Sequence, residues 1–194
     1  MTDSFGPVLP RGFYARPTTV VARELLGKIL VHGAVAGRIV ETEAYLDRDE
    51  QGRIDLAAHS AAGITSRTRV IFGPPGHAYV YLAYGIHECL NIVAEQDGLP
   101  GCVLIRALEP VAGLELMRAR RPSAKNDGEL ANGPGKLTRA MGITRRDYGA
   151  DVTSGELTVR DAAAFASEMV LETARIGITK CVDWQLRYLL QETL

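Results

Sequence analysis

Apolar and polar residues alternate along several stretches of this chain, and a period of two is typical of β-strands. The clearest stretch is residues 38–46, where β-branched and aromatic residues predict a strand. Together with residues 29–32 and a turn at residues 33–37, it is expected to form a hairpin. Further strands are expected at residues 78–83, 87–94 and 102–108, and short strands are expected beyond residue 157.

Three other stretches predict helices. A capped helix is expected over residues 18–26, where Gly27 ends it. Glu109 and Pro110 are expected to open an amphipathic helix that continues to about Arg121. A third helix is expected to follow Gly133 and to end near residue 141. Without an internal repeat or a linker-like stretch, the pattern predicts a single α+β domain over residues 1–194, with a curved, mostly antiparallel β-sheet and flanking helices.

The strand at residues 38–46 carries two acids among apolar residues. Strict alternation assigns its residues to two faces, with Ile39, Glu41, Glu43 and Tyr45 on one and Val40, Thr42, Ala44 and Leu46 on the other. Carboxylates on an otherwise apolar strand cost free energy unless water or a partner satisfies them. This cost is the first indication of a functional site.

Composition narrows the class of protein and the compartment in which it is expected. Hydrophobic residues make up 46% of the 194 residues and charged residues 23%, as in ordinary globular proteins. No apolar run is long enough for a membrane span, and residues 1–5 lack the pattern of a signal peptide. Three widely spaced cysteines argue against a disulfide framework. We therefore expect a cytoplasmic protein with no membrane partner.

Several motifs fail on inspection. Gly133, Gly135 and Lys136 look like part of a phosphate-binding loop, but Leu137 follows the lysine and no glycine stands at residue 130. A plain turn and helix cap is the favoured interpretation, although Lys136 could still meet a phosphate. The histidines and cysteines have no spacing typical of zinc, and the chain has no Gly-x-Ser-x-Gly elbow. A metal is not expected.

Tyrosines gather in the strand at residues 78–83. Tyr79 and Tyr81 are expected on one face, and Tyr84 at the strand end before Gly85. A buried phenol needs a hydrogen-bond partner, so a plain core strand would more often use aliphatic residues. The pattern fits either an amphipathic β face or a stacking wall for a planar ligand with an exposed aromatic wedge. Arg106, in another apolar strand, needs a partner, for which Glu41 and Glu43 are the candidates.

Taken together, these residues resemble the alkyladenine (3-methyladenine) DNA glycosylase family. The resemblance covers nearly the whole chain in order and is carried by residues 37–45, 57–60, 79–85, 90–92, 102–110 and 132–137. It implies a monofunctional enzyme without metal or cofactor that flips an alkylated or deaminated purine nucleotide out of duplex DNA. The enzyme would then hydrolyse the bond between base and sugar. Its partner would be double-stranded DNA containing damaged purines, and it would act as a monomer.

The resemblance also implies roles for individual residues. Glu43 would be the general base that activates water, and Arg106 would help to hold this water together with main chain near residues 175–177. The remaining roles would be a base pocket of Tyr45, His59 and Tyr81, discrimination against normal guanine by Asn91, a wedge at Tyr84, and DNA contacts at Tyr79, Ile86, His87 and Lys136.

Some residues depart from the pattern of the family. Ile86 and His87 stand where relatives often have Met or Tyr, so the contact beside the wedge is expected to differ. Residues 180–188 depart from the family's usual close, and the net charge of −1 predicts weaker nonspecific DNA binding than in basic relatives. Two alternatives remain open: a binder of damaged or flipped bases that does not cleave, and an unrelated β-rich hydrolase with a carboxylate site.

Overall fold

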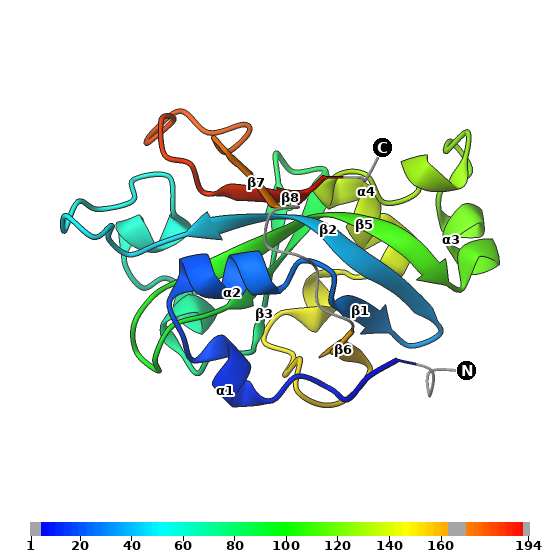
Figure 1. The fold of residues 1–194 in the computed structure, drawn as a ribbon, viewed down its shortest axis with the longest axis horizontal. Coiled ribbons are helices and arrows are strands. Elements are labelled where there is room, and N and C mark those ends of the chain that lie inside the picture. Colours follow the sequence, from blue (N-terminus) through cyan, green and yellow to red (C-terminus); the bar gives the residue numbers. More distant parts are fainter. Residues whose placement is uncertain (1–4, 163–169, 192–194) are drawn as a thin grey trace.

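A computed structural model describes residues 5–162 and 170–191. Its described part contains a curled sheet of eight strands with helices packed on it (Figure 1). The strands are β1 (Ile29–His32), β2 (Val35–Tyr45), β3 (Ala78–Ala83), β4 (His87–Val93), β5 (Cys102–Ala112), β6 (Leu157–Arg160), β7 (Val170–Thr173) and β8 (Arg187–Leu190). The α-helices are α1 (Arg11–Tyr14), α2 (Thr18–Glu24), α3 (Leu114–Arg120) and α4 (Pro134–Met141). The expected α+β class with an antiparallel sheet is confirmed.

Strand β2 is the centre of the sheet. The order of the main path is β3-β4-β5-β2-β1-β6, and every pairing is antiparallel. β5 pairs with nearly the full length of β2. Along the other edge, β1 pairs with the start of β2 and β8 with residues 41–43. Segments that are far apart in the sequence are therefore brought together around the last part of β2.

The main hydrophobic core lies between the sheet and the helices. Helix α2 packs on β2 and β5, and α4 packs on β4 and β5. Residues with almost no exposure fill this core, among them Leu25, Leu30, Leu90, Ile105, Met117 and Leu137. A second, smaller cluster contains Tyr79, packed with Tyr45 and Tyr81. Because Val80 belongs to the main core, the tyrosines of β3 lie on the opposite face of the sheet.

A β-bulge in β2 changes which side chains lie on each face of the strand. The register with β5 shifts between Ile39 and Glu41 and again before Thr42. An extra residue in one strand reverses which side chains point inward. Ile39 therefore lies in the main core with Ala44, whereas Tyr45 packs in the second cluster. The expectation that Ile39 shares a face with Tyr45 is wrong.

Two predicted boundaries also differ. The turn expected at residues 33–37 is confined to Gly33 and Ala34, because β2 already begins at Val35. The helix expected at Pro110 begins only at Leu114, since β5 continues through Ala112. Pro110 is tolerated there because β4 pairs with β5 only at residues 102–104, so a missing N–H removes no bond on that edge.

The hairpin of β3 and β4 matches the prediction closely. β3 has the expected bounds, and β4 ends one residue earlier than expected. Tyr84 and Gly85 close the hairpin with φ angles of 51° and 72°, and the Ile86 N–H donates to the Ala83 carbonyl. Two positive φ values are what a type I′ turn requires. The hairpin tip is therefore a short, tight turn.

Candidate active site

A cavity of about 580 Å³ opens beside the carboxyl end of β2. This volume lies within the usual range for sites that bind small molecules. Strands β2 to β5, the segment around His59, the start of α4 and residues 176–180 all contribute to its wall. Seven of the residues expected at a site from the sequence line it: Tyr45, His59, Tyr81, Tyr84, His87, Asn91 and Arg106.

Glu43 lies behind this wall and has no exposed surface. Its Oε1 accepts a hydrogen bond of 2.8 Å from the main-chain N–H of Ile176, and its Oε2 accepts one of 2.9 Å from the hydroxyl of Tyr45. Arg106 approaches Oε1 at 3.3 Å. All three partners line the cavity. A buried carboxylate is thus held by donors at the edge of the cavity, as its charge requires.

Arg106 is held by the second acid of β2. Its Nε donates to Oε1 of Glu41 at 2.8 Å, and Arg187 of β8 donates to the same oxygen at 2.6 Å. The register explains this contact, because Glu41 pairs with Ala107 and Glu43 with Leu104, on either side of Arg106. Glu41 therefore acts as a structural partner that holds Arg106 and Arg187 in place. Arg106 contacts both acids of β2.

A buried ion pair anchors the segment that delivers the Ile176 N–H. Arg175 and Asp55 form two hydrogen bonds, of 2.6 and 2.8 Å, and both side chains are completely buried. Arg175 also donates to the Ala44 carbonyl, and Asp55 accepts from the Leu46 N–H. The pair thus holds three parts of the chain together: the end of β2, the loop after it and the segment that contains Ile176.

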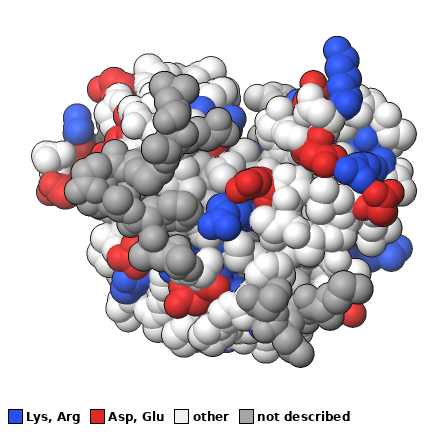
Figure 2. Space-filling view, turned by 45° about the vertical axis from the view of Figure 1, so that its right-hand side comes forward, with Lys and Arg blue, Asp and Glu red and all other residues white. Residues whose placement is uncertain are grey.

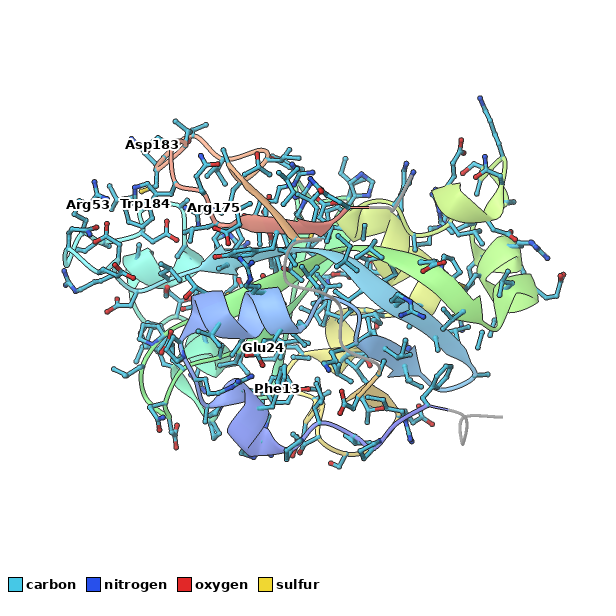
Figure 3. The ribbon with its side chains drawn as sticks, in the orientation of Figure 1. Phe13, Glu24, Arg53, Arg175, Asp183 and Trp184 are labelled. Atoms are coloured by element: carbon cyan, nitrogen blue, oxygen red, sulfur yellow. The ribbon has the colours of Figure 1, made fainter. Side chains whose placement is uncertain are left out.

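Further contacts hold the same two loops together. Figure 3 labels Arg53, Arg175 and Trp184 in this region, near the connection that leads from β7 to β8. The guanidinium of Arg53 lies 5.2 Å from the centre of the Trp184 ring, as in a cation–π contact. The thiol of Cys181 faces the carbonyl of Ile54 at 3.9 Å. This side of the cavity is therefore a pair of loops joined by side chains.

Aromatic rings form the opposite wall. Tyr79 and Tyr81 stack with ring centres 5.3 Å apart, and the ring of His59 stands edge-on to Tyr81 at 4.7 Å. Burial raises the pKa of Tyr81, and burial followed by the neighbouring Glu43 raises the pKa of Tyr45. Burial, and then the charge of Arg67, lowers the pKa of His59 to about 4. These three rings are uncharged at neutral pH, which suits stacking on a planar ligand.

Asn91 lies in the floor of the cavity between two strands. Its side-chain amide donates to the Tyr79 carbonyl at 3.2 Å, and its oxygen faces the thiol of Cys102 at 3.9 Å. Because the amide is 3% exposed and already bonded, its orientation is fixed. Cys89 and Cys102 also line the cavity, and burial raises the pKa of both thiols. They are packing groups without thiolate character.

The tip of the β3–β4 hairpin stands free at the mouth of the cavity. Tyr84 is 87% exposed and Ile86 is 72% exposed, the highest values among large hydrophobic residues of the described part. Tyr84 lines the cavity, whereas Ile86 does not. His87 follows at the start of β4 and packs on Gly135, where a side chain on the glycine would come within 2.9 Å of the imidazole. Gly135 therefore permits α4 to approach the start of β4 closely.

Two of the DNA-contact candidates, Tyr79 and Lys136, lie outside the cavity lining. Tyr79 is only 1% exposed, and its hydroxyl lies 2.9 Å from Nδ1 of His59, so it supports the wall from behind and presents no surface to DNA. Lys136 is exposed at the start of α4, and its ammonium donates to Asn132 at 2.8 Å. Neither lines the cavity. The interpretation of residues 133–136 as a turn and helix start is confirmed.

Several residues that support or line the cavity were missed from the sequence. Asp55 stands alone between Ile54 and Leu56, and a single acid between apolar residues was the available signal. Arg67 lies in a polar turn and carried no signal of its own. Of the lining residues 176–180, only Ile176 and Gly177 were expected, as main chain near the catalytic water and through the resemblance.

The described residues contain neither a cluster of metal ligands nor a helix that could span a membrane. Within residues 5–162 and 170–191, no three His, Cys, Asp or Glu side chains gather closely enough to hold a metal ion. None of the helices in these ranges has the length and apolarity of a membrane span. On the described part of the face in Figure 2, basic and acidic side chains are intermingled and form no continuous basic surface.

Comparison with known proteins gives the chain its family. The family model for methylpurine-DNA glycosylase matches residues 12–194. A protein of Methanocella arvoryzae is 55% identical over 186 residues, which cover 93% of this chain and 90% of the relative. A protein of Methanoculleus marisnigri is 50% identical over 189 residues, covering 94% and 95%, and one of Koribacter versatilis is 50% identical over 188, covering 93% and 88%.

All three relatives are provisionally named 3-methyladenine DNA glycosylases. The family match extends over almost the whole chain, and each relative is aligned along nearly all of its own length. The buried Glu43 and the aromatic cavity beside it belong to this matched region. The chain therefore belongs to the methylpurine-DNA glycosylase family and is a DNA glycosylase, a hydrolase that acts on N-glycosyl bonds.

Proposed function

We propose that this glycosylase removes alkylated or deaminated purines that are flipped out of duplex DNA into the cavity beside Glu43, and that Glu43 activates the water. The observation that carries the proposal is the position of Glu43, held between Tyr45, Arg106 and the main chain of Ile176 at the edge of an aromatic cavity. The proposed enzyme acts as a monomer.

In the proposed reaction, a flipped purine enters the cavity and stacks on the rings of Tyr45 and Tyr81. The water is proposed to bind on the cavity side of the pair that Glu43 and Arg106 form. Arg106 contacts Oε1 of Glu43 at 3.3 Å and lines the cavity, so it can hold a water molecule next to the carboxylate. The side chains of Asn91 and Cys102 face the base from the floor.

For an alkylated purine cation, the proposed chemistry balances without a metal or a second catalytic acid. Water attacks C1′ of the sugar, Glu43 takes one of its protons, and the bond from C1′ to the purine nitrogen breaks with both electrons going to the base. An alkylated purine cation leaves as a neutral base, and the DNA keeps an abasic sugar with a hydroxyl at C1′. The Glu43 charge also opposes the positive charge that develops on the sugar in the transition state.

Tyr84 supports the flipping step in this proposal. It stands exposed on a tight turn at the mouth of the cavity, where an aromatic ring can enter the base stack and occupy the place of the flipped nucleotide. His87 and Lys180, which line the same mouth, are the proposed contacts to the DNA backbone. Salt is expected to weaken the binding only modestly, because few basic groups take part.

A Glu43→Gln variant tests the proposal. Glutamine keeps the size of the side chain and cannot take a proton from water, so the variant should bind a duplex with a single lesion and release no base from it. Binding is measured by fluorescence anisotropy and base release by cleavage at the abasic site. If the wild-type protein binds the lesion but releases no base at any salt concentration, it is a binder of damaged bases and the proposed mechanism is wrong.

A further inference from the structure

Arg67 joins three aromatic residues of the cavity wall from outside the cavity. Its Nε donates to the hydroxyl of Tyr79 at 3.2 Å, and one of its terminal nitrogens faces Nε2 of His59 at 3.3 Å. Its guanidinium also lies 4.8 Å from the centre of the Tyr81 ring, in cation–π geometry. Arg67 does not line the cavity and is itself exposed. One surface residue thus contacts all three rings.

These contacts determine which nitrogen of His59 carries the proton. A guanidinium has only donors, so Nε2 of His59 must accept and carries no proton. The single proton of the neutral ring is then on Nδ1, where it is donated to the hydroxyl oxygen of Tyr79 at 2.9 Å. A protonated ring would bring an N–H of Nε2 against the N–H groups of Arg67. The geometry therefore disfavours the imidazolium form and favours one tautomer of the neutral ring.

No other group around His59 favours a positive charge. The side chains that face it are Arg67, Tyr79 and Tyr81, and among the described residues no carboxylate bonds to its ring. Burial raises the pKa of Tyr79 to about 12, so its phenol is neutral as well. The lowered pKa of His59, caused first by burial and then by Arg67, agrees with this geometry.

We propose that Arg67 is a positioning residue that holds His59 as the neutral Nδ1–H tautomer, so that the cavity accepts a purine that already carries a positive charge. This inference rests on the proposed function. A protonated His59 would place its charge in the cavity wall and repel a cationic base, whereas the charge of Arg67 lies outside the wall, in contact with water that screens it. Arg67 would thereby set the class of base that the pocket prefers.

The ring nitrogens of His59 provide a test that does not depend on activity. The ¹⁵N chemical shifts of the imidazole report both tautomer and charge, and a His59→Gln variant identifies the signals. Between pH 5 and 8 the wild-type ring should remain the neutral Nδ1–H form. In Arg67→Met, the ring should become a mixture of tautomers and its titration midpoint should rise by about half a pH unit or more.

Two further variants control for charge and for donor geometry. Arg69→Met removes an exposed arginine two residues away and should leave the His59 signals unchanged. Arg67→Lys keeps a cationic donor and should restore part of the wild-type behaviour. The inference is overturned if Arg67→Met, folded by circular dichroism, shows the same tautomer and the same titration midpoint as the wild-type protein.

Base release then tests the consequence for the substrate. Single-turnover rates are compared from pH 5 to 8 for duplexes with 7-methylguanine, which is cationic, and hypoxanthine, which is neutral. For Arg67→Met, the rate for 7-methylguanine should fall relative to hypoxanthine towards the acid end, in proportion to the fraction of His59 that the ¹⁵N titration finds protonated at each pH. Equal losses for both bases at every pH would mean a purely structural role and would overturn the inference.

The two proposals fail in distinguishable ways. If the wild-type protein releases neither base, the proposed function is wrong, while the ¹⁵N measurement still decides whether Arg67 holds the His59 tautomer. If the wild-type protein releases both bases and Arg67→Met keeps their ratio constant with pH, the proposed function stands and the inference about Arg67 is wrong.

Discussion

Asp55 and Arg175 stand 120 residues apart in the sequence and form a two-pronged ion pair in which both side chains are completely buried. Asp55→Asn leaves the buried guanidinium without a counter-charge and is expected to lower the free energy of unfolding by about 3–5 kcal/mol. Urea unfolding measures this loss. Base release should fall as well, because Arg175 positions the neighbouring N–H of Ile176 on Glu43.

An exposed ion pair offers a matched control. Arg118 and Asp127 also form two hydrogen bonds, of 2.9 and 2.8 Å, but both side chains are 46% exposed. Asp127→Asn should cost about 1 kcal/mol or less, because water screens the pair and solvates the remaining charge. Similar losses for Asp55→Asn and Asp127→Asn would contradict the structural role given to the buried pair.

Tyr45→Phe separates the hydroxyl of this residue from its ring. The ring stays between Arg175 and the cavity, 4.7 Å from the guanidinium, but the hydrogen bond of 2.9 Å to Oε2 of Glu43 is lost. A hydrogen bond to a charged group contributes about 1.5–3 kcal/mol, so the single-turnover rate should fall roughly 10- to 100-fold. The affinity for lesion DNA, measured by anisotropy, should change little.

Tyr148→Phe is the control for this change, because its hydroxyl bonds to main chain outside the cavity. A loss of rate as large as that of Tyr45→Phe would show that any removed phenol in this region slows the reaction. A loss of affinity for Tyr45→Phe without a loss of rate would contradict the role of its hydroxyl in orienting Glu43.

Tyr84→Ala tests the wedge. Stacking of an aromatic ring on a base contributes about 1–3 kcal/mol, so base release from a fully paired lesion duplex should fall by roughly 10- to 100-fold. A lesion placed in a single-nucleotide bulge has no pairing partner to replace and should be affected much less. Ile86→Ala, at the same exposed tip, should have the smaller effect because Ile86 does not line the cavity. Equal losses on paired and bulged lesions would rule out the wedge.

The titration of His59 predicts part of the acid sensitivity of the fold. Burial first and Arg67 second lower the pKa of His59 from its ordinary value of 6.5 to about 4. Below pH 6.5 the unfolded chain takes up a proton that the folded protein refuses, so stability falls with pH until about pH 4. His59→Gln should flatten this decline between pH 6.5 and 4 in urea unfolding.

The exposed His87 serves as the control, because His87→Gln should leave the decline as it is in the wild-type protein. A decline of the same steepness in wild type and His59→Gln would contradict the neutral, buried state of this ring.

Local patterns predicted the β3–β4 hairpin well. Alternating tyrosines fixed which side chains of β3 share a face, and Tyr84 with Gly85 marked the turn. Both features depend on residues that are close in the sequence. The start of α3 was predicted wrongly because the prediction used only neighbouring residues. Glu109 and Pro110 are typical of a helix start, but pairing with β2 extends β5 through them. Tertiary pairing overrode a local preference.

The part of the candidate site that could be predicted consists of charged residues that stand alone in apolar strands. Glu41, Glu43 and Arg106 each interrupt an apolar strand, and the structure brings the three into contact. The bulge in β2 could not be foreseen, because an extra residue leaves no mark on the composition of the strand. Asp55 with Arg175, and Arg67 with His59, depend on segments that meet only in the folded chain.

Tyr84 occupies a tight turn that is closed by a hydrogen bond of 3.0 Å between the Ile86 N–H and the Ala83 carbonyl. A repair enzyme tries many undamaged base pairs for each damaged one. A loop that became ordered at every trial would lose about 1–2 kcal/mol of conformational entropy per residue each time. A stiff hairpin tip loses this entropy once, when the chain folds. In the proposed role of Tyr84 as a wedge, each later trial then costs only the disturbance of the DNA, which favours a fast search for damage.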